Sequence, residues 1–136
     1  MIEFVEKIPA VQEYNDLTEQ VGWGTEPEHI VREALENTVY SVCAYDGGRM
    51  VGYARLIGDK ALFAYIQDVM VAPDYQGRQI GSRLMEHILR EVKRLKSFSP
   101  NLRTYLGASK GKEGFYEKFG FVSRRDVDLG EGMILL

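Results

Sequence analysis

Residues 67–82 read QDVMVAPDYQGRQIGS and combine the end of a strand, a glycine-containing loop and the start of a helix. The apolar strand residues stop at Pro73, because proline cannot donate a hydrogen bond to a sheet. A helix is predicted from about Gln79 to Lys96, because apolar residues recur there every three or four positions. These residues are Ile80, Leu84, Ile88 and Val92, with Met85, Leu89 and Leu95 beside them.

The start of this predicted helix is suited to binding an anion. The first amide groups of a helix have no acceptor within the helix, and they lie at the positive end of its dipole. Gly77 and Gly81 leave room for a phosphate to approach the backbone, and Arg78 adds positive charge. The sequence contains neither the G-x-x-x-x-G-K-[ST] loop of nucleotide-binding proteins nor the G-x-G-x-x-G motif of dinucleotide-binding proteins.

Periodicity and turn signals along the chain predict an α/β domain in the order β-α-α-β-β-β-α-β-α-β-β. Thr25 and Glu28 have the spacing of a capping box at the start of the second helix, and Gly120 is predicted to end the last one. The predicted sheet is mixed and mostly antiparallel, with a β-α-β crossover in the middle. Strands are predicted at 2–5, 39–45, 51–57, 62–71, 102–108, 121–127 and 133–136, and helices at 11–20, 25–35, 79–96 and 112–119.

Length and composition are those of one ordinary globular domain, and no internal boundary divides residues 1–136. The formal net charge of −3 disfavours a nucleic-acid-binding surface. No apolar run approaches the roughly 20 residues that cross a bilayer, and the N-terminus lacks a signal-peptide pattern. A lone cysteine, Cys43, cannot form an internal disulfide, so we expect a cytoplasmic protein. His29 and His87 have no partners at metal-ligand spacing, so we expect no metal.

Two motifs resemble those of the GCN5-related N-acetyltransferases (GNATs). Residues 76–82 resemble motif A, a Gln/Arg-x-x-Gly-x-Gly/Ala loop that holds the pyrophosphate of coenzyme A. Gln79 stands where that motif has its first glycine, and we expect it to have a helical φ and to point outward. Residues 114–121, GFYEKFGF, resemble motif B, a helix that ends in Phe-Tyr-x-x-x-Gly-Phe. The resemblance covers nearly the whole chain, and is strongest to small bacterial acetyltransferases and more distant to plant serotonin-type arylalkylamine acetyltransferases.

The resemblance implies acetyl-CoA as cosubstrate and a sheet splayed at its centre. In the family, a bulge separates the strand before motif A from its neighbour, and the pantetheine arm pairs there like an extra strand. In this chain the freed backbone groups belong to Val69 and Val71, and an amide near Val69 or Met70 polarises the thioester carbonyl. The pyrophosphate is then held by the loop residues Gln76, Gly77, Arg78, Gln79, Ile80, Gly81 and Ser82.

Tyr116 and Asp68 are the candidate catalytic side chains. The resemblance to motif B implies that Tyr116 protonates the departing sulfur after direct attack of an amine through a tetrahedral intermediate. A thiol has a pKa of about 8.5 and a tyrosine about 10, so this transfer is only slightly uphill. Phe115 and Phe119 share one face of the predicted helix, which leaves Tyr116 free to point into the cleft. Asp68 either accepts the amine's proton or stabilises a neighbouring loop or a cationic substrate.

No motif identifies the acceptor. The leading expectation is a primary amine of a small molecule, and a protein lysine or N-terminus is the variant within the same class. A non-catalytic module that senses acyl-CoA is the alternative from another class. Trp23, Tyr53, Arg55 and Tyr65 are candidates for lining the acceptor site, with core packing as the alternative for Trp23. The family-level expectation for the assembly is a homodimer, without nucleic acid or membrane as a partner.

Overall fold

The computed structural model describes residues 1–136 and contains five strands, four α-helices and two short 3-10 helices. The strands are β1 (Ile2–Val5), β2 (Tyr40–Asp46), β3 (Arg49–Gly58), β4 (Phe63–Val71) and β5 (Arg103–Leu106). The helices are α1 (Val11–Gln20), α2 (Glu28–Glu36), η1 (Pro73–Tyr75), α3 (Ile80–Phe98), α4 (Glu113–Glu117) and η2 (Arg124–Val127). The chain divides into two compact units, Met1–Tyr105 and Leu106–Leu136.

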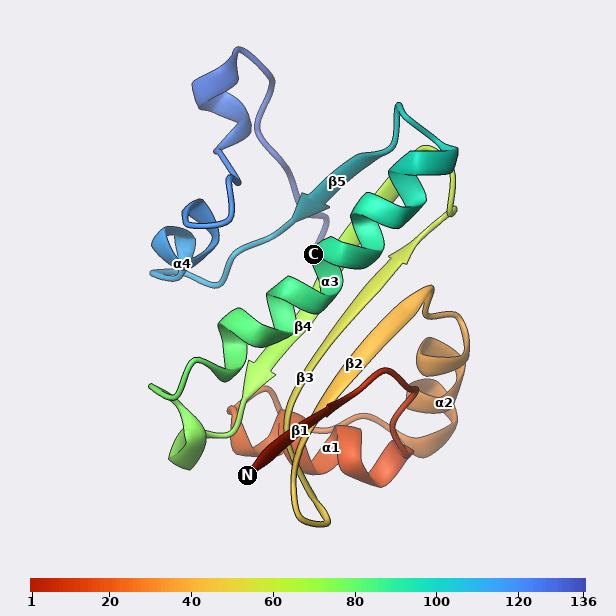
Figure 1. Ribbon diagram of the computed structural model, residues 1–136, viewed down its shortest axis with the longest axis vertical. Helices are drawn as coiled ribbons and strands as arrows, with labels where there is room; N and C mark the ends of the chain where they lie inside the picture. Colours follow the sequence, from red (N-terminus) through yellow and green to blue (C-terminus); the bar gives the residue numbers. More distant parts are fainter. The chain divides into compact units, whose positions relative to one another are not determined.

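The first unit is built on a sheet in the order β1-β2-β3-β4-β5. Strands β1 to β4 are antiparallel neighbours, and β5 runs in the same direction as β4 (Figure 1). Helix α3 crosses from β4 to β5 over one face, while α1 and α2 cover the other face (Figure 1). The predicted α/β fold with a mixed, mostly antiparallel sheet is therefore confirmed.

The larger part of the core lies between α3 and the sheet. The apolar stripe of α3 is buried as predicted, apart from the partly exposed Leu89. The two layers are closest at Gly52, where an added Cβ would lie 3.1 Å from the Ile80 Cγ2 and 3.2 Å from the Leu84 Cδ1. Because Gly52 has no side chain, the first turn of α3 packs directly on β3. This contact fixes the position of the loop that precedes α3.

The sheet is irregular on both sides of β4. On the β3 side, β4 contains one extra residue, so that Asp68 and Val69 together oppose Ala54 in a β-bulge. On the other side, β5 joins β4 near the start of both strands, where the Arg103 N–H donates to the Leu62 carbonyl at 2.8 Å. The two strands make few contacts along the rest of their length. The sheet is thus splayed between β4 and β5, as the resemblance implies, although β5 is an edge strand here and the opening does not lie at the centre of the sheet.

The second unit departs from the predicted element order. The strands predicted at 121–127 and 133–136 are wrong, because Arg124–Val127 forms the 3-10 helix η2 and residues 133–136 have no regular structure. A strand is stable only with a hydrogen-bonded neighbour, and neither segment pairs with one. No residue from 106 to 136 is buried, so apolar periodicity in this region does not mark a core.

Two predicted helix ends have different outcomes. The capping box at Thr25 is wrong, because α2 begins at Glu28 after Pro27 and has no side-chain cap. The left-handed conformation of Gly120 is confirmed by its φ of 92°, but α4 ends earlier than predicted, at Glu117, whose carbonyl accepts from the Gly120 N–H at 3.0 Å. A left-handed glycine just after a helix satisfies carbonyls that the last turn leaves free.

Candidate active site

The loop between β4 and α3 contains two left-handed residues. Gly77 has a φ of 82°, and Gln79 has a φ of 64°. The expectation that Gln79 has a helical φ is therefore wrong. A residue with a Cβ is strained in this conformation by roughly 1–2 kcal/mol, whereas glycine adopts it freely. The loop keeps the backbone shape that suits glycine, although a glutamine stands at this position.

The first turn of α3 is open to an anion. The N-cap residue Gln79 makes no side-chain cap, and the first turn carries no acidic residue. The amides of Ile80, Gly81 and Ser82 therefore lie at the positive end of the longest helix without an internal acceptor. By contrast, the other three α-helices carry an acid in the first turn, namely Glu13, Glu28 and Glu113.

Charged and aromatic side chains brace the loop around η1. Two guanidinium groups contact the Tyr75 ring, whose centre lies 5.3 Å from the Arg49 Cζ and 4.7 Å from the Arg78 Cζ. The Tyr75 hydroxyl donates to Asp46. Arg49 donates two hydrogen bonds to the Asp74 carboxylate, at 3.0 and 3.2 Å. Arg78 remains exposed beside Gly77, where its charge adds to that of the open helix end.

The backbone of β4 turns alternate amides away from β3. The Ala72 N–H donates to a β3 carbonyl at 2.8 Å. Because hydrogen-bonding groups alternate along an antiparallel strand, the Met70 amide also faces β3, and those of Val69 and Val71 face the β5 side. The Gln76 side chain donates to the Val71 carbonyl at 3.1 Å, which ties the loop back to the end of β4.

Asp68 is buried at the bulge, and its side chain is 6% exposed. Its Oδ2 accepts a hydrogen bond from the Arg55 Nε at 2.7 Å and another from the Tyr14 hydroxyl at 2.8 Å. The Gln67 Nε2 lies 3.5 Å from the Oδ1. Burial and the nearby Asp68 carboxylate raise the pKa of Tyr14, so its hydroxyl stays protonated and remains a donor. Arg55 and Asp68 form a buried ion pair beside the opened strand.

Tyr14 is the residue of this cluster that sequence reasoning missed. It lies 54 positions from Asp68 in the sequence, so no local motif connects the two. The available signal is helical spacing, since Tyr14, Leu17 and Thr18 lie three and four positions apart on α1. Leu17 and Thr18 are buried, which indicates that this face of α1 is turned toward the sheet.

Tyr116 lies in the second unit, whereas the other predicted site residues lie in the first. The Tyr116 ring packs against Phe115, with centres 5.0 Å apart, and against Phe121, with centres 6.3 Å apart. Phe115 also contacts Phe119, with ring centres 5.4 Å apart. Partial burial raises the pKa of Tyr116. The hydroxyl is therefore protonated at neutral pH and can serve as an acid.

The predicted acceptor-site residues differ in exposure. Tyr53 is completely buried, which contradicts the expectation that it faces an open cleft. The Arg55 side chain is only 12% exposed. Trp23 and Tyr65 are exposed and accessible to a ligand. No group of three or more His, Cys, Asp and Glu side chains gathers as metal ligands, and no helix is both long and apolar enough to span a membrane.

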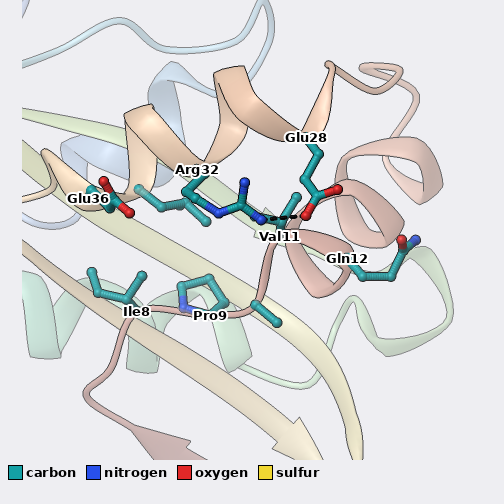
Figure 2. A pocket seen from close by; sticks show the side chains of 9 residues that line it. Ile8, Pro9, Val11, Gln12, Glu28, Arg32 and Glu36 are labelled. Carbon is teal, nitrogen blue, oxygen red and sulfur yellow. Dashed lines mark hydrogen bonds and ion pairs between the residues drawn. The ribbon is translucent and has the colours of Figure 1, made fainter.

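A hollow of about 460 Å³ lies between the β1–α1 connection and α2 (Figure 2). Arg32 forms an ion pair with Glu28 at its edge (Figure 2). None of the predicted site residues lines this hollow, so it is separate from the bulge and the loop. Its lining residues are Ile8, Pro9, Ala10, Val11, Gln12, Glu28, Arg32, Leu35 and Glu36.

Comparisons with known proteins agree with the motifs. Residues 37–123 match the family model described as an acetyltransferase (GNAT) domain. A ycf52-like uncharacterized N-acetyltransferase of Prochlorococcus marinus is 34% identical over 113 residues, covering 80% of this chain and 61% of that protein. The chloroplastic serotonin N-acetyltransferase 2 of Oryza sativa is 32% identical over 120 residues, covering 85% of this chain and 58% of that protein. The chain therefore spans less than two thirds of the length of both relatives.

A solved structure extends the comparison to three dimensions. The GNAT-family acetyltransferase of Streptococcus pneumoniae TIGR4 has a TM-score of 0.83 and is 28% identical in sequence. The likeness covers 100% of this chain and 98% of that one.

Proposed function

Because this chain belongs to the GNAT family of acetyltransferases, we propose that it transfers the acetyl group of acetyl-CoA to a primary amine of a small molecule. One observation carries the proposal: the uncapped first turn of α3 follows, after the loop that contains η1, a strand whose Val69 and Val71 amides face away from β3. An anion site and a row of free backbone groups therefore follow each other along the chain. Coenzyme A presents matching groups, a pyrophosphate followed by the amides of its pantetheine arm.

The residues at the first turn of α3 fit the pyrophosphate. The amides of Ile80, Gly81 and Ser82 supply donors at the positive end of a 19-residue helix. Gly77 offers unobstructed backbone, because an added Cβ would have no neighbour within 4 Å. Exposed Arg78 supplies a formal positive charge. In this proposal the Gln76 side chain supports the loop rather than the phosphate, since it holds the loop against β4.

The amides of Val69 and Val71 fit the pantetheine arm and the thioester. Both face the opened β5 side, where an extended ligand can pair with them as an added strand does. In the proposal, the Val69 amide donates to the thioester oxygen and stabilises the charge that develops on it. The Met70 amide is committed to β3, so Val69 is the donor we assign.

The proposed reaction is direct transfer. The neutral amine nitrogen attacks the thioester carbonyl carbon, and the carbonyl oxygen becomes an oxyanion. The oxyanion then re-forms the double bond as the carbon–sulfur bond breaks. Tyr116 gives its proton to the leaving thiolate and recovers one from water, while the nitrogen loses its extra proton to water. Asp68 is the alternative acceptor for that last proton.

A thiol-release assay with acetyl-CoA and a panel of primary amines tests the function. Release of coenzyme A together with an acetylated amine, identified by mass spectrometry, is the expected result. Binding of coenzyme A without turnover of any amine, small molecule or peptide would favour the sensing module and contradict the enzyme.

Calorimetry with coenzyme A tests the site. We expect Ser82→Asp to weaken binding by at least about tenfold, because the new carboxylate repels the pyrophosphate and occupies the open helix end. Ser97→Asp in the last turn of the same helix is the matched control and should leave affinity unchanged. Equal affinities for the two variants would place the anion elsewhere.

A further inference from the structure

Asp68 is strained and buried at the same time. Four residues other than glycine have a positive φ, and Asp68, at 58°, is the only buried one among Lys60, Asp68, Gln79 and Asp128. A bulge whose first residue is left-handed usually has glycine at that position. A strained backbone persists only where the surrounding structure holds it. The side chain of Asp68 must therefore make contacts that a glycine cannot make.

Those contacts hold the carboxylate from two elements. The Arg55 Nε of β3 and the Tyr14 hydroxyl of α1 both donate to the Asp68 Oδ2, at 2.7 and 2.8 Å. The Arg55 and Asp68 side chains are 12% and 6% exposed. Hydrogen bonds to a charged group are stronger than neutral ones, and burial limits the competition from water.

The cluster continues from Arg55 into α2. The Arg55 Nη1 donates to the Ala34 carbonyl at 3.1 Å and to the Thr38 hydroxyl at 3.3 Å, at the C-terminal end of α2. Tyr14 is held in turn by an edge-to-face contact with the Tyr53 ring, with centres 5.9 Å apart. The carboxylate at the bulge is thereby connected to α1, α2 and β3.

We propose that Tyr14 and Arg55 are positioning residues for acetyl transfer, because through Asp68 they fix the shape of the β4 bulge. Val69 directly follows Asp68, so any rotation of the Asp68 backbone also turns the Val69 amide. That amide is the donor assigned to the thioester oxygen, and this inference rests on the proposed function. A donor that is held in place before the reaction stabilises the oxyanion without having to reorganise.

The same contacts argue against Asp68 as the general base. A base has to accept a proton, and a protonated Asp68 would leave the Arg55 guanidinium buried without its counter-charge. Removing one partner of a buried ion pair is strongly unfavourable. The carboxylate is more effective here as a permanent acceptor for Tyr14 and Arg55.

Tyr14→Phe distinguishes Asp68 as a general base from Asp68 as an acceptor that holds the bulge. The substitution leaves the carboxylate and its ion pair in place. We expect kcat to fall by about tenfold, because a small misplacement of a catalytic group is costly. The KM for acetyl-CoA should change by less than about twofold, and the pH midpoint of kcat should stay where it is. If Asp68 is the base, its carboxylate keeps that role in the variant. An undiminished kcat with a shifted midpoint would then overturn the proposal.

Asp68→Gly tests the side chain without imposing strain, because glycine accepts the left-handed φ. We expect the variant to be less stable, because the Arg55 guanidinium loses its buried counter-charge, but to fold and bind coenzyme A, with kcat lowered by about tenfold or more. The double variant Tyr14→Phe/Asp68→Gly should be no slower than Asp68→Gly alone, because the hydroxyl then has no carboxylate to hold. An unchanged kcat in Asp68→Gly, or full additivity in the double variant, would contradict the proposal. Arg55→Lys should not preserve the wild-type kcat, because Lys lacks the fork that reaches both Asp68 and Ala34.

A matched control variant and a measurement that needs no turnover distinguish a failure of this inference from a failure of the proposed function. Tyr40→Phe also removes a tyrosine hydroxyl from a carboxylate, Glu6 at 2.6 Å, and should leave kcat unchanged. If wild type acetylates no amine, the proposed function fails. Amide hydrogen exchange at Met70, the first residue after the bulge whose amide faces β3, then decides the inference alone. Exchange at least about tenfold faster in Tyr14→Phe than in Tyr40→Phe is expected, and equal exchange would overturn it.

Discussion

The two compact units derive their order from different contacts. Every buried hydrophobic side chain belongs to Met1–Tyr105, where helices cover both faces of the sheet. Leu106–Leu136 buries no residue and relies on local contacts, chiefly the aromatic rings around α4 and the hydrogen bonds of two short turns. Buried layers fix the direction of a backbone amide, whereas local contacts are sufficient to hold a single side chain.

The proposed mechanism uses this difference. Stabilising an oxyanion depends on the direction of a fixed donor, and the Val69 amide lies in the layered unit next to the buried Asp68. A general acid needs a protonated group within reach and can tolerate some motion. Tyr116 lies in the unit without a core and packs against aromatic rings, and partial burial raises its pKa.

The largest expected effect comes from removing the acid of the second unit. Tyr116→Phe should lower kcat by about 10²- to 10⁴-fold, because the thiolate would then leave without a proton donor. The affinity for acetyl-CoA should hardly change, since the proposed phosphate and pantetheine contacts lie in the first unit. Because Tyr116 acts in its protonated form and its pKa is raised, the wild-type rate should fall only above about pH 10. That alkaline limb should be absent in the variant.

Thiol-release kinetics and calorimetry on the same preparation measure both quantities. Tyr40→Phe serves again as the control for loss of a tyrosine hydroxyl. A Tyr116→Phe enzyme with wild-type kcat would remove the second unit from the chemistry and leave it a structural part.

The sequence predicts the first unit better than the second for a physical reason. Helix α1 has the predicted bounds of 11–20, and β4 begins one residue from the predicted position. Both segments bury one side, so their periodicity follows the packing. The segments at 121–127 and 133–136 have strand-like composition but no neighbouring strand. Periodicity indicates which residues can be buried, and pairing depends on partners that a single segment does not contain.

Stability measurements should sharpen the contrast between the units. Leu84 is completely buried under Gly52, so Leu84→Ala should lower the free energy of unfolding by about 2–5 kcal/mol. Leu135 is 97% exposed, and Leu135→Ala should stay within about 0.5 kcal/mol of wild type. Urea denaturation of both variants provides the comparison. A loss well above 1 kcal/mol for Leu135→Ala would show that the second unit has apolar packing in solution.

Two positions of the site show where sequence reasoning lacks information. Asp68 and Gln79 both occupy left-handed backbone, which sequence patterns assign to glycine. At Asp68 the strain is compensated by Tyr14 and Arg55, which are distant in sequence. At Gln79 no compensation is present, because its side chain forms no cap and is exposed. Neither residue type indicates a left-handed backbone. Only the side-chain contacts distinguish the compensated strain at Asp68 from the uncompensated strain at Gln79.

Gln79→Gly should give the smallest effect and the opposite sign. Relief of the left-handed strain is worth roughly 1–2 kcal/mol, and the added freedom of glycine in the unfolded chain costs about 0.5–1 kcal/mol. We therefore expect the free energy of unfolding to rise by up to about 1.5 kcal/mol, with coenzyme A affinity kept, since the loop amides stay in place. Glu86→Gly, on the exposed side of α3, is the matched control and should cost about 1 kcal/mol, because its backbone is helical. If both variants lose stability equally, Gln79 is not strained, and the loop would not need the glycine-like shape that we assign to the phosphate site.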